Sequence, residues 1–211
     1  MKAKEYADKN IRWLGHDGFV IRGSRTVVFD PFQIEDGPTA DVVLITHDHY
    51  DHCSPEDVQK VSGEHTVIVT EKDSAKKLSG DVRVLSPGET LSVGEIKIEA
   101  VAAYNQNKQF HPKENGWLGF IVEMDGMRIY HAGDTDLIPE MKGMAVNIAL
   151  LPVSGTYVMT AEEAVEAALD VAPDVAIPMH FGAIVGDRSD AETFRDRLKG
   201  KVEVLMPKAD A

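Results

Sequence analysis

His47-Asp48-His49-Tyr50-Asp51-His52 is the stretch from which the architecture of this chain can be inferred, because it places three histidines and two aspartates within six residues. In an extended segment, alternation points His47, His49 and Asp51 the same way, and His52 turns toward a neighbouring position. Imidazole nitrogens and carboxylate oxygens suit a divalent ion such as zinc, with iron or manganese as alternatives. The stretch therefore predicts a metal-binding loop rather than a polar loop that is rich in histidine by chance.

The residues on either side of this loop indicate a strand before it and a helix after it. Residues 42–45 form a short, wholly apolar run, which is typical of a strand covered on both faces. Ser54-Pro55-Glu56-Asp57 predicts a helix start, because serine caps well, proline suits the first position, and acidic groups suit the positive end of the helix dipole. This helix is predicted to end near Val61.

The remaining chain contains more strands than helices. Further strands are predicted at residues 11–14, 19–22, 26–29, 66–69, 82–85, 91–93, 96–102, 175–179 and 202–205. Further helices are predicted at 72–78, from the capping box of Thr160 and Glu163 to Val171, and from a cap at Ser189 or Asp190 to about Gly200. Because helices are interspersed rather than strictly alternating with strands, the pattern predicts a four-layer αββα sandwich, two mixed sheets with outer helices, of the α/β (α+β) class.

A predicted hairpin brings distant polar residues to one end of a sheet. Asp125-Gly126 lies between two apolar runs within residues 118–130, which is a strong signal for a two-residue turn. His111 precedes this hairpin and Asp134 follows it, so the two are expected at the same sheet end, while His180 follows the strand predicted at 175–179. A lone histidine near a strand end is more often structural, and His131, still on its strand, is expected to face the core or to support a ligand.

Composition limits the classes of protein to consider. The chain has 22 basic and 35 acidic residues and a formal charge of −13, which disfavours extended binding to nucleic acid. No apolar run approaches the ~20 residues that cross a bilayer, and residues 1–10 lack the apolar stretch of a secretory signal, so no membrane contact and a cytoplasmic location are expected. No repeat or linker divides the chain, which predicts one domain over residues 1–211. Composition leaves the oligomeric state open.

Cys53 is the only cysteine, so no intrachain disulfide can form. It lies beside the histidine-rich loop, where two interpretations compete. A small packed neighbour is favoured, because a free cysteine usually behaves as a small hydrophobe. A soft metal ligand is the alternative.

The order of these motifs resembles the metallo-β-lactamase-fold hydrolase superfamily. Within it, the chain is most similar to the small metal-dependent hydrolases related to ascorbate-6-phosphate lactonase. The resemblance covers about residues 15–186. It rests on the histidine-rich loop, on His111, Gly133-Asp134-Thr135 and Met179-His180, and on the stretches Gly15-His16-Asp17-Gly18-Phe19, Asp30-Pro31-Phe32, Ala103-Tyr104-Asn105, Phe110-His111-Pro112-Lys113, Tyr130-His131-Ala132 and Leu151-Pro152-Val153.

The resemblance implies a specific set of metal ligands and an αββα sandwich. One ion would be held by His47, His49 and His111, and the other by Asp51, His52 and His180, with Asp134 between them. Asp30 resembles an acidic residue that orients a ligand imidazole in this family.

Two departures from sister branches narrow the expected activity. Redox di-iron members of the superfamily carry glutamate at the position of His49, so the histidine disfavours electron transfer. True β-lactamases of the main zinc class lack the ligand equivalent to His52 and carry cysteine at the position of Asp134. Hydrolysis of β-lactam antibiotics is therefore not expected.

These residues predict a hydrolase with two divalent ions, zinc first and manganese or iron as alternatives, acting on a small ester, lactone or phosphodiester. A water between two cations has its pKa lowered toward neutrality, and the resulting hydroxide would attack the substrate. Asp51 is expected to orient that hydroxide, and His16 either contacts the substrate, donates a proton or is structural.

A small-molecule substrate is expected, and Lys108 and Lys113 flank His111, where they would receive an anionic group unless they are simply solvated. A redox di-iron protein and a non-catalytic metal-binding or metabolite-sensing module are the alternatives to a hydrolase. A structural zinc needs only four ligands in a closed shell, so the larger ligand set favours the enzyme.

Overall fold

A computed structural model describes residues 1–207, and the first part of the chain builds a six-stranded mixed sheet. The strands are hydrogen-bonded in chain order, antiparallel from the first to the third and parallel from the third to the sixth. They are β1 (Ile11–Gly15), β2 (Gly18–Arg22), β3 (Thr26–Phe29), β4 (Val42–Leu44), β5 (Val67–Thr70) and β6 (Asp81–Val84).

The remaining strands form a seven-stranded sheet in the order β13-β12-β11-β10-β9-β8-β7. It is antiparallel from β7 to β10 and parallel from β10 to β13. Its strands are β7 (Thr90–Val93), β8 (Ile96–Ala102), β9 (Leu118–Met124), β10 (Met127–His131), β11 (Ile148–Pro152), β12 (Val175–Met179) and β13 (Glu203–Val204).

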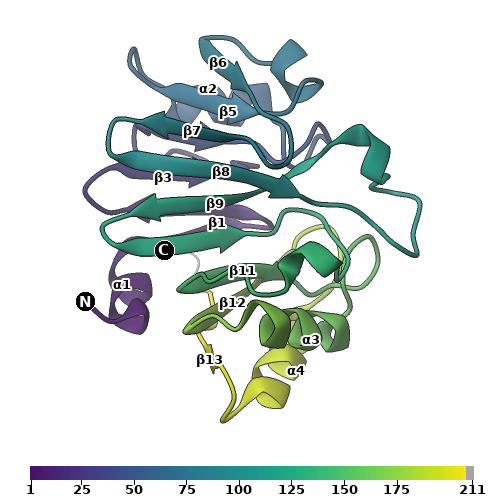
Figure 1. Cartoon of the computed structure of the whole chain (residues 1–211). Helices are drawn as coiled ribbons and strands as arrows, with labels where there is room; N and C mark the ends of the chain where they lie inside the picture. The colour runs from purple at the N-terminus through teal and green to yellow at the C-terminus, as the bar shows by residue number, and fades with distance from the viewer. Residues whose placement is uncertain (208–211) are drawn as a thin grey trace.

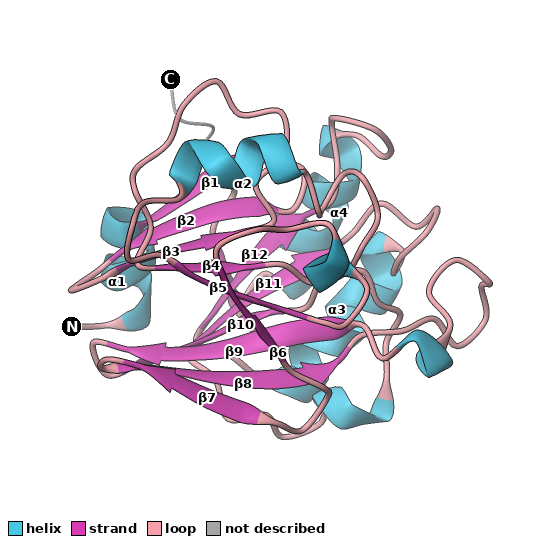
Figure 2. Cartoon of the chain, turned by 90° about the horizontal axis from the view of Figure 1, so that it is seen from above, coloured by secondary structure: helices cyan, strands magenta, loops and turns pink. Residues whose placement is uncertain are grey.

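Helices pack against the two sheets, mainly on their outer faces (Figures 1 and 2). They are α1 (Ala3–Asn10), α2 (Pro55–Val61), α3 (Ala161–Val171) and α4 (Arg188–Leu198), with short 3-10 turns at Ser74–Lys76, Lys113–Asn115 and Pro139–Met141. Figure 1 shows α3 and α4 side by side next to β11 and β12, and α1 lies against β1 and β2. Within residues 1–207, no helix combines the length and the apolar character that crossing a membrane requires.

Alternation along the strands of the first sheet divides its side chains between two apolar layers. Val20, Val28 and Val43 face α2 and pack with Val58 and Val61 of that helix. Their chain neighbours, among them Phe19, Phe29 and Leu44, belong to the larger core shared with the second sheet and with α3 and α4. This arrangement confirms the predicted four-layer αββα sandwich of two mixed sheets with outer helices.

Most predicted elements are present, including the helix start at Ser54, the capping box of Thr160 and Glu163, and the hairpin turn at Asp125-Gly126. The single domain was predicted over residues 1–211, of which 208–211 lie outside the described residues. In the described part, no bound of a predicted strand differs from the observed bound by more than one residue.

Two predicted helical features were wrong, and one predicted strand is shorter than expected. Residues 72–78 form only a short 3-10 turn, because the Glu71 carboxylate accepts the amides of Asp73 and Ser74 and holds a tight turn instead. The last helix is capped by Asp187, since Asp190 takes the third helical position and bonds back to the Asp187 amide. The strand predicted at 202–205 is reduced to Glu203–Val204.

Two elements were missed. α1 carries an apolar stripe of helical spacing, with Ala3, Tyr6, Ala7 and Asn10 all buried, so its signal was present in the sequence. β11 is a buried strand between β10 and β12, and its apolar run is interrupted only by the proline at its end.

Candidate metal centre

The histidine-rich loop lies where the ends of strands from both sheets meet. It follows β4 and ends at Ser54, the N-cap of α2. The Leu118 amide of β9 donates to the Thr46 carbonyl at 3.0 Å, which joins the loop to the second sheet. The His180 amide, directly after β12, donates to the His16 carbonyl at 3.2 Å, which joins the same end of the second sheet to the β1–β2 turn. The strand ends therefore bring four separate segments together.

The structure places all seven predicted ligands around one centre. The Nε2 atoms of His111 and His180 lie 3.1 and 3.2 Å from Oδ2 of Asp134. His52 Nε2 lies 3.5 Å from the other Asp134 oxygen. Three sets of residues have donor atoms within 4.8 Å of one another. The first set is His47, His49 and His111. The second is His16, Asp51, His52 and His180, and the third is Asp17, His52, Asp134 and His180.

The donor atoms at this centre fit divalent ions. Several are buried and have no hydrogen-bond partner among the described residues: the Nε2 atoms of His52, His111 and His180, Oδ1 of Asp134, and both oxygens of Asp17. A buried polar atom without a partner costs about 1–3 kcal/mol, so a cluster of them requires compensation. Nitrogen and oxygen lone pairs that converge in this way are the donors that zinc, iron or manganese ions accept.

Three of the ligand candidates are oriented by a hydrogen bond on the side of the ring that faces away from the centre. His52 Nδ1 donates to Asp30 at 3.0 Å, and Asp30 also accepts from the Thr46 amide and hydroxyl at 2.8 and 2.6 Å. His111 Nδ1 lies 3.1 Å from the Asn105 side-chain oxygen, and His180 Nδ1 lies 2.8 Å from the Ser154 hydroxyl. Because Nδ1 of each of these three histidines is engaged in a hydrogen bond, Nε2 is the nitrogen that faces the centre and can bind a metal. The contact of Asp30 with His52 agrees with the orienting role that the resemblance implied, and the role of His52 as a metal ligand stays a prediction.

Three residues of the centre have an unusual backbone conformation. His16, Asp30 and His180 have φ angles of 48°, 36° and 59°, in the left-handed region that side chains other than glycine rarely adopt. Such conformations cost about 1–3 kcal/mol each and persist where the surrounding structure imposes them, which is common at functional sites. The fold thus retains strained backbone at three segments to aim these side chains inward.

Burial and charge set the protonation of the centre. Burial lowers the pKa of His47 and of His49, which leaves both imidazoles neutral and able to bind a metal. Burial would raise the pKa of Asp134, but the neighbouring His180 and His52 hold it well below its ordinary value. Burial would lower the pKa of His52, but Asp134 and Asp30 raise it. Asp134 is therefore an anion in the middle of the histidines.

His16 contacts the predicted catalytic carboxylate rather than open space. Its Nε2 lies 3.1 Å from Oδ2 of Asp51, and its side chain is buried. Burial would raise the pKa of Asp51, and the bond from His16 lowers it, so the carboxylate is ionised and His16 carries its proton on Nε2. The geometry pairs the two residues that the sequence singled out as catalytic.

Other residues considered from the sequence lie apart from the donor cluster. His131 stacks on Phe29 with ring centroids 4.8 Å apart, and its two nitrogens contact the Asp17 carbonyl and the Gly133 amide, as expected of a core residue. Cys53 is buried, and burial raises the pKa of its thiol to about 11, which fits a packed neighbour rather than a ligand.

The two lysines beside His111 are engaged in ion pairs. Lys108 Nζ lies 2.6 Å from Asp136, and Lys113 Nζ lies 3.0 Å from Glu140. The expectation that they receive an anionic group does not fit these contacts, because each charge is already balanced by a carboxylate.

A cavity of about 210 Å³ opens beside the donor cluster. Its polar lining consists of candidate site residues, His49, Asp51, His111 and Asp134. Its other lining residues are Tyr50, Phe110, Tyr157 and Ile184. The exposed fractions of Tyr50, Phe110 and Ile184 are 67%, 49% and 39%, so a large apolar surface surrounds the approach to the metal ligands.

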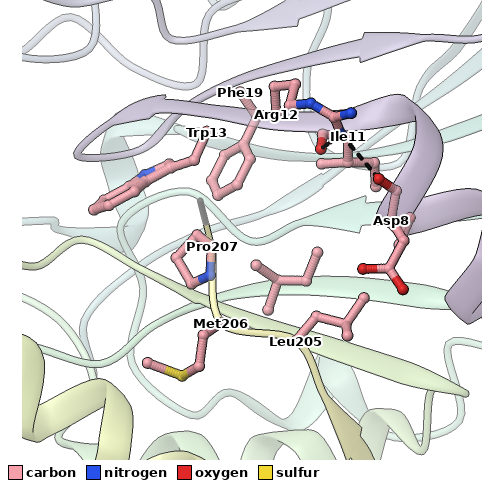
Figure 3. Close-up of a pocket in the computed structure, with 10 residues that line it drawn as sticks. Asp8, Ile11, Arg12, Trp13, Phe19, Leu205, Met206 and Pro207 are labelled. Carbon is pink, nitrogen blue, oxygen red and sulfur yellow. Dashed lines mark hydrogen bonds between the residues drawn. The ribbon is translucent and has the colours of Figure 1, made fainter. Parts of the chain in front are cut away.

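A second cavity, of about 220 Å³, has a different character (Figure 3). It lies between β1 and the segment that follows β13, and apolar side chains such as Trp13, Phe19 and Leu205 line it. Its charged lining residues are Asp8 and Arg12, and the Arg12 guanidinium donates to the Asp8 carbonyl at 3.0 Å. These side chains offer no set of converging metal donors.

Sequence reasoning missed Asp17. Asp17 lies in one of the stretches that carry the family resemblance, and a carboxylate directly after His16 in a tight turn was a visible signal. The structure places it in the donor set with His52, Asp134 and His180.

Two mixed sheets in an αββα sandwich, with a histidine and aspartate cluster at the strand ends, define the metallo-β-lactamase class of proteins. Residues 10–180 match the family described as the beta-lactamase superfamily domain, and the chain belongs to this family, among the UPF0173 metal-dependent hydrolases. The narrower likeness to the ascorbate-6-phosphate lactonase group stays a prediction.

The relatives cover nearly the whole chain. UPF0173 metal-dependent hydrolase Ta0764 of Thermoplasma acidophilum is 34% identical over 95% of this chain and 96% of its own length. A protein of known crystal structure from Parabacteroides distasonis, which is named as a metal-dependent hydrolase, is 34% identical in sequence to this chain. The two structures have a TM-score of 0.85 over 95% of this chain and 93% of that chain. The archaeal metallo hydrolase Igni18 of Ignicoccus hospitalis is 22% identical with a TM-score of 0.78 over 96% of each chain, a likeness of fold alone.

Proposed function

We propose that this protein hydrolyses a small ester, lactone or phosphodiester at a centre that holds two divalent ions, with zinc the first expectation and manganese or iron the alternatives. The observation that carries the proposal is the set of buried donor atoms that lack hydrogen-bond partners and surround Asp134. His47, His49 and His111 would hold one ion, and Asp51, His52 and His180 the other. Asp134, within 3.1–3.5 Å of three of these histidines, is the group positioned to serve both ions.

Bound divalent ions would supply Lewis acidity and lower the pKa of a water molecule toward neutrality. The chain's own residues would then orient the reactants. Asp51 lines the cavity and is ionised, so it can accept a proton or a hydrogen bond from the attacking water. His16 lies behind Asp51 and donates to it, so we assign His16 the role of positioning that carboxylate.

The cavity supports a small substrate that carries an apolar or aromatic group. Tyr50, Phe110, Tyr157 and Ile184 would bury such a group while the scissile bond lies against the site residues on the other wall. The lysines that could have bound an anion are paired with carboxylates. Neutral aryl or alkyl esters and lactones are therefore the first substrates to test, and phosphodiesters the second.

The test combines metal analysis with a substrate screen. Protein loaded with zinc, manganese or iron is assayed on aryl esters, lactones and aryl phosphodiesters, and an Asp134→Asn variant purified in parallel measures contaminating hydrolases. Turnover by the parent protein but not by the variant is expected. Two bound ions with no turnover on any class would favour a sensing module, and iron with a visible absorption band and redox activity would favour a di-iron redox protein.

A cytoplasmic location remains part of this proposal and rests on the sequence alone. Fractionation of the source cells tests it, and recovery of the protein in the membrane or secreted fraction would contradict it.

A further inference from the structure

Asp17 is a fully buried carboxyl group whose two oxygens have no hydrogen-bond partner among the described residues. Buried carboxylates normally accept several hydrogen bonds, as Asp30 does from the Thr46 amide, the Thr46 hydroxyl and His52. Asp30 and Asp17 are equally buried, yet only Asp30 has hydrogen-bond partners. A cation bound between Asp17 and its neighbours would satisfy these two oxygens, and a proton shared with a neighbouring carboxylate is the alternative that the experiment below tests.

The position of Asp17 indicates where that charge would lie. A carboxylate oxygen of Asp17 lies within 4.8 Å of ligand atoms of His52, Asp134 and His180. Its Oδ2 is 3.9 Å from Nδ1 of His52, the nitrogen already engaged by Asp30. Two carboxylates, Asp17 and Asp134, thus converge on one small volume, where their repulsion is relieved by a cation between them.

The turn that carries Asp17 is tightly constrained. His16 before it has a φ angle of 48°, and a Cβ on Gly18 after it would lie 3.1 Å from the carbonyl oxygens of Asp30 and Gly15. The Asp17 carbonyl also accepts from Nε2 of His131 at 2.9 Å. The backbone is therefore fixed on both sides, and the side chain is aimed at the centre before any ion binds, as a preorganised ligand requires.

We propose that Asp17 is a direct ligand of the second ion, the ion that Asp51, His52, His180 and Asp134 would hold. This inference rests on the two-ion proposal above and extends its ligand set. With Asp17 included, the second site contains three carboxylates and two imidazoles, whereas the first contains three imidazoles and only the shared carboxylate of Asp134. Because carboxylate oxygens suit harder ions, the second site is expected to favour manganese or iron(II) more strongly than the first.

The experiment compares Asp17→Ala and Asp17→Asn with Asp57→Asn. Asp57 is a matched control because it is buried and acidic but fully hydrogen-bonded, to the Gln33 amide, the Ser54 hydroxyl and Lys60, outside the donor cluster. Metal-free protein is titrated with Mn²⁺ and with Zn²⁺, and the thermal midpoint of unfolding is measured without metal. A crystal structure of the Mn²⁺-loaded parent protein completes the set.

The parent protein and Asp57→Asn are expected to bind two equivalents. Both Asp17 variants are expected to keep one equivalent at parental affinity and to lose more than about 100-fold in affinity for the other, beyond the 10–100-fold that outer groups usually cost. Metal-free Asp17→Ala is expected to melt no lower than the metal-free parent, because it removes an unsatisfied group, whereas metal-free Asp57→Asn melts lower. In the crystal, an Asp17 oxygen is expected within about 2.0–2.2 Å of the second ion.

Two equivalents of unchanged affinity in the Asp17 variants would overturn this inference and leave the two-ion proposal intact. So would a lower melting temperature of metal-free Asp17→Ala, which would indicate a structural acid that shares a proton with Asp134. A parent protein that binds one equivalent would overturn both, so the two failures are distinguishable.

Discussion

Replacing Asp134 by asparagine is expected to release both metal ions while leaving the fold in place. Asp134 lies 3.1 Å from His111, 3.2 Å from His180 and 3.5 Å from His52, so its carboxylate reaches both predicted ion positions. Removing a residue that is hydrogen-bonded to a metal ligand usually lowers the metal affinity about 10–100-fold, so removing a shared ligand should lower the affinity for each ion at least about 100-fold. At 1.4 kcal/mol per tenfold, this is about 2.8 kcal/mol for each ion.

The assay is metal content by mass spectrometry after dialysis, together with calorimetric titration of the metal-free protein. His131→Ala is the control. His131 is buried, lies three residues before Asp134 in the sequence and stacks on Phe29, and both of its ring nitrogens are engaged in hydrogen bonds. It is expected to lose about 2–4 kcal/mol of stability through the cavity it leaves, but less than tenfold in metal affinity. Equal metal loss in the two variants would refute the ligand assignment.

Three further outcomes are expected. Phe110→Ala should raise KM for aryl esters about fivefold with little change in kcat, because one aromatic contact contributes about 1 kcal/mol; an unchanged KM would remove Phe110 from the substrate site. Cys53→Ala should retain the parental metal content, since the thiol is buried with its pKa raised to about 11, and metal loss would revive the ligand interpretation. Metal-free protein should unfold at lower urea concentration at pH 5.5 than at pH 7.5. In the folded state burial lowers the pKa of four histidines, His16, His47, His49 and His131, whereas the unfolded chain protonates them below about pH 6.5. This effect is expected to outweigh the opposite effect of two groups whose pKa is raised, His52 and Asp17. A higher urea midpoint at pH 5.5 would contradict that balance.

Local signals accounted for most of the fold. The strand before the histidine-rich loop, the Ser54 cap after it and the Asp125-Gly126 turn depend on short-range rules of capping, alternation and turn geometry. The predictions that were wrong concern segments where hydrogen bonds from a nearby side chain stabilise one local structure over another. Glu71 stabilises a tight turn in place of a helix, and Asp190 serves inside the last helix while Asp187 caps it.

The sequence by itself determined which residue types were available for metal binding and, through the hairpin, that His111 and Asp134 would share a sheet end. Tertiary structure decided which donors remain free. Asp30 and Asp17 look alike in the sequence, yet hydrogen bonds from Thr46 and His52 satisfy the first and none among the described residues reaches the second. The availability of a buried carboxylate depends on partners contributed by distant segments, and only the folded chain brings those segments together.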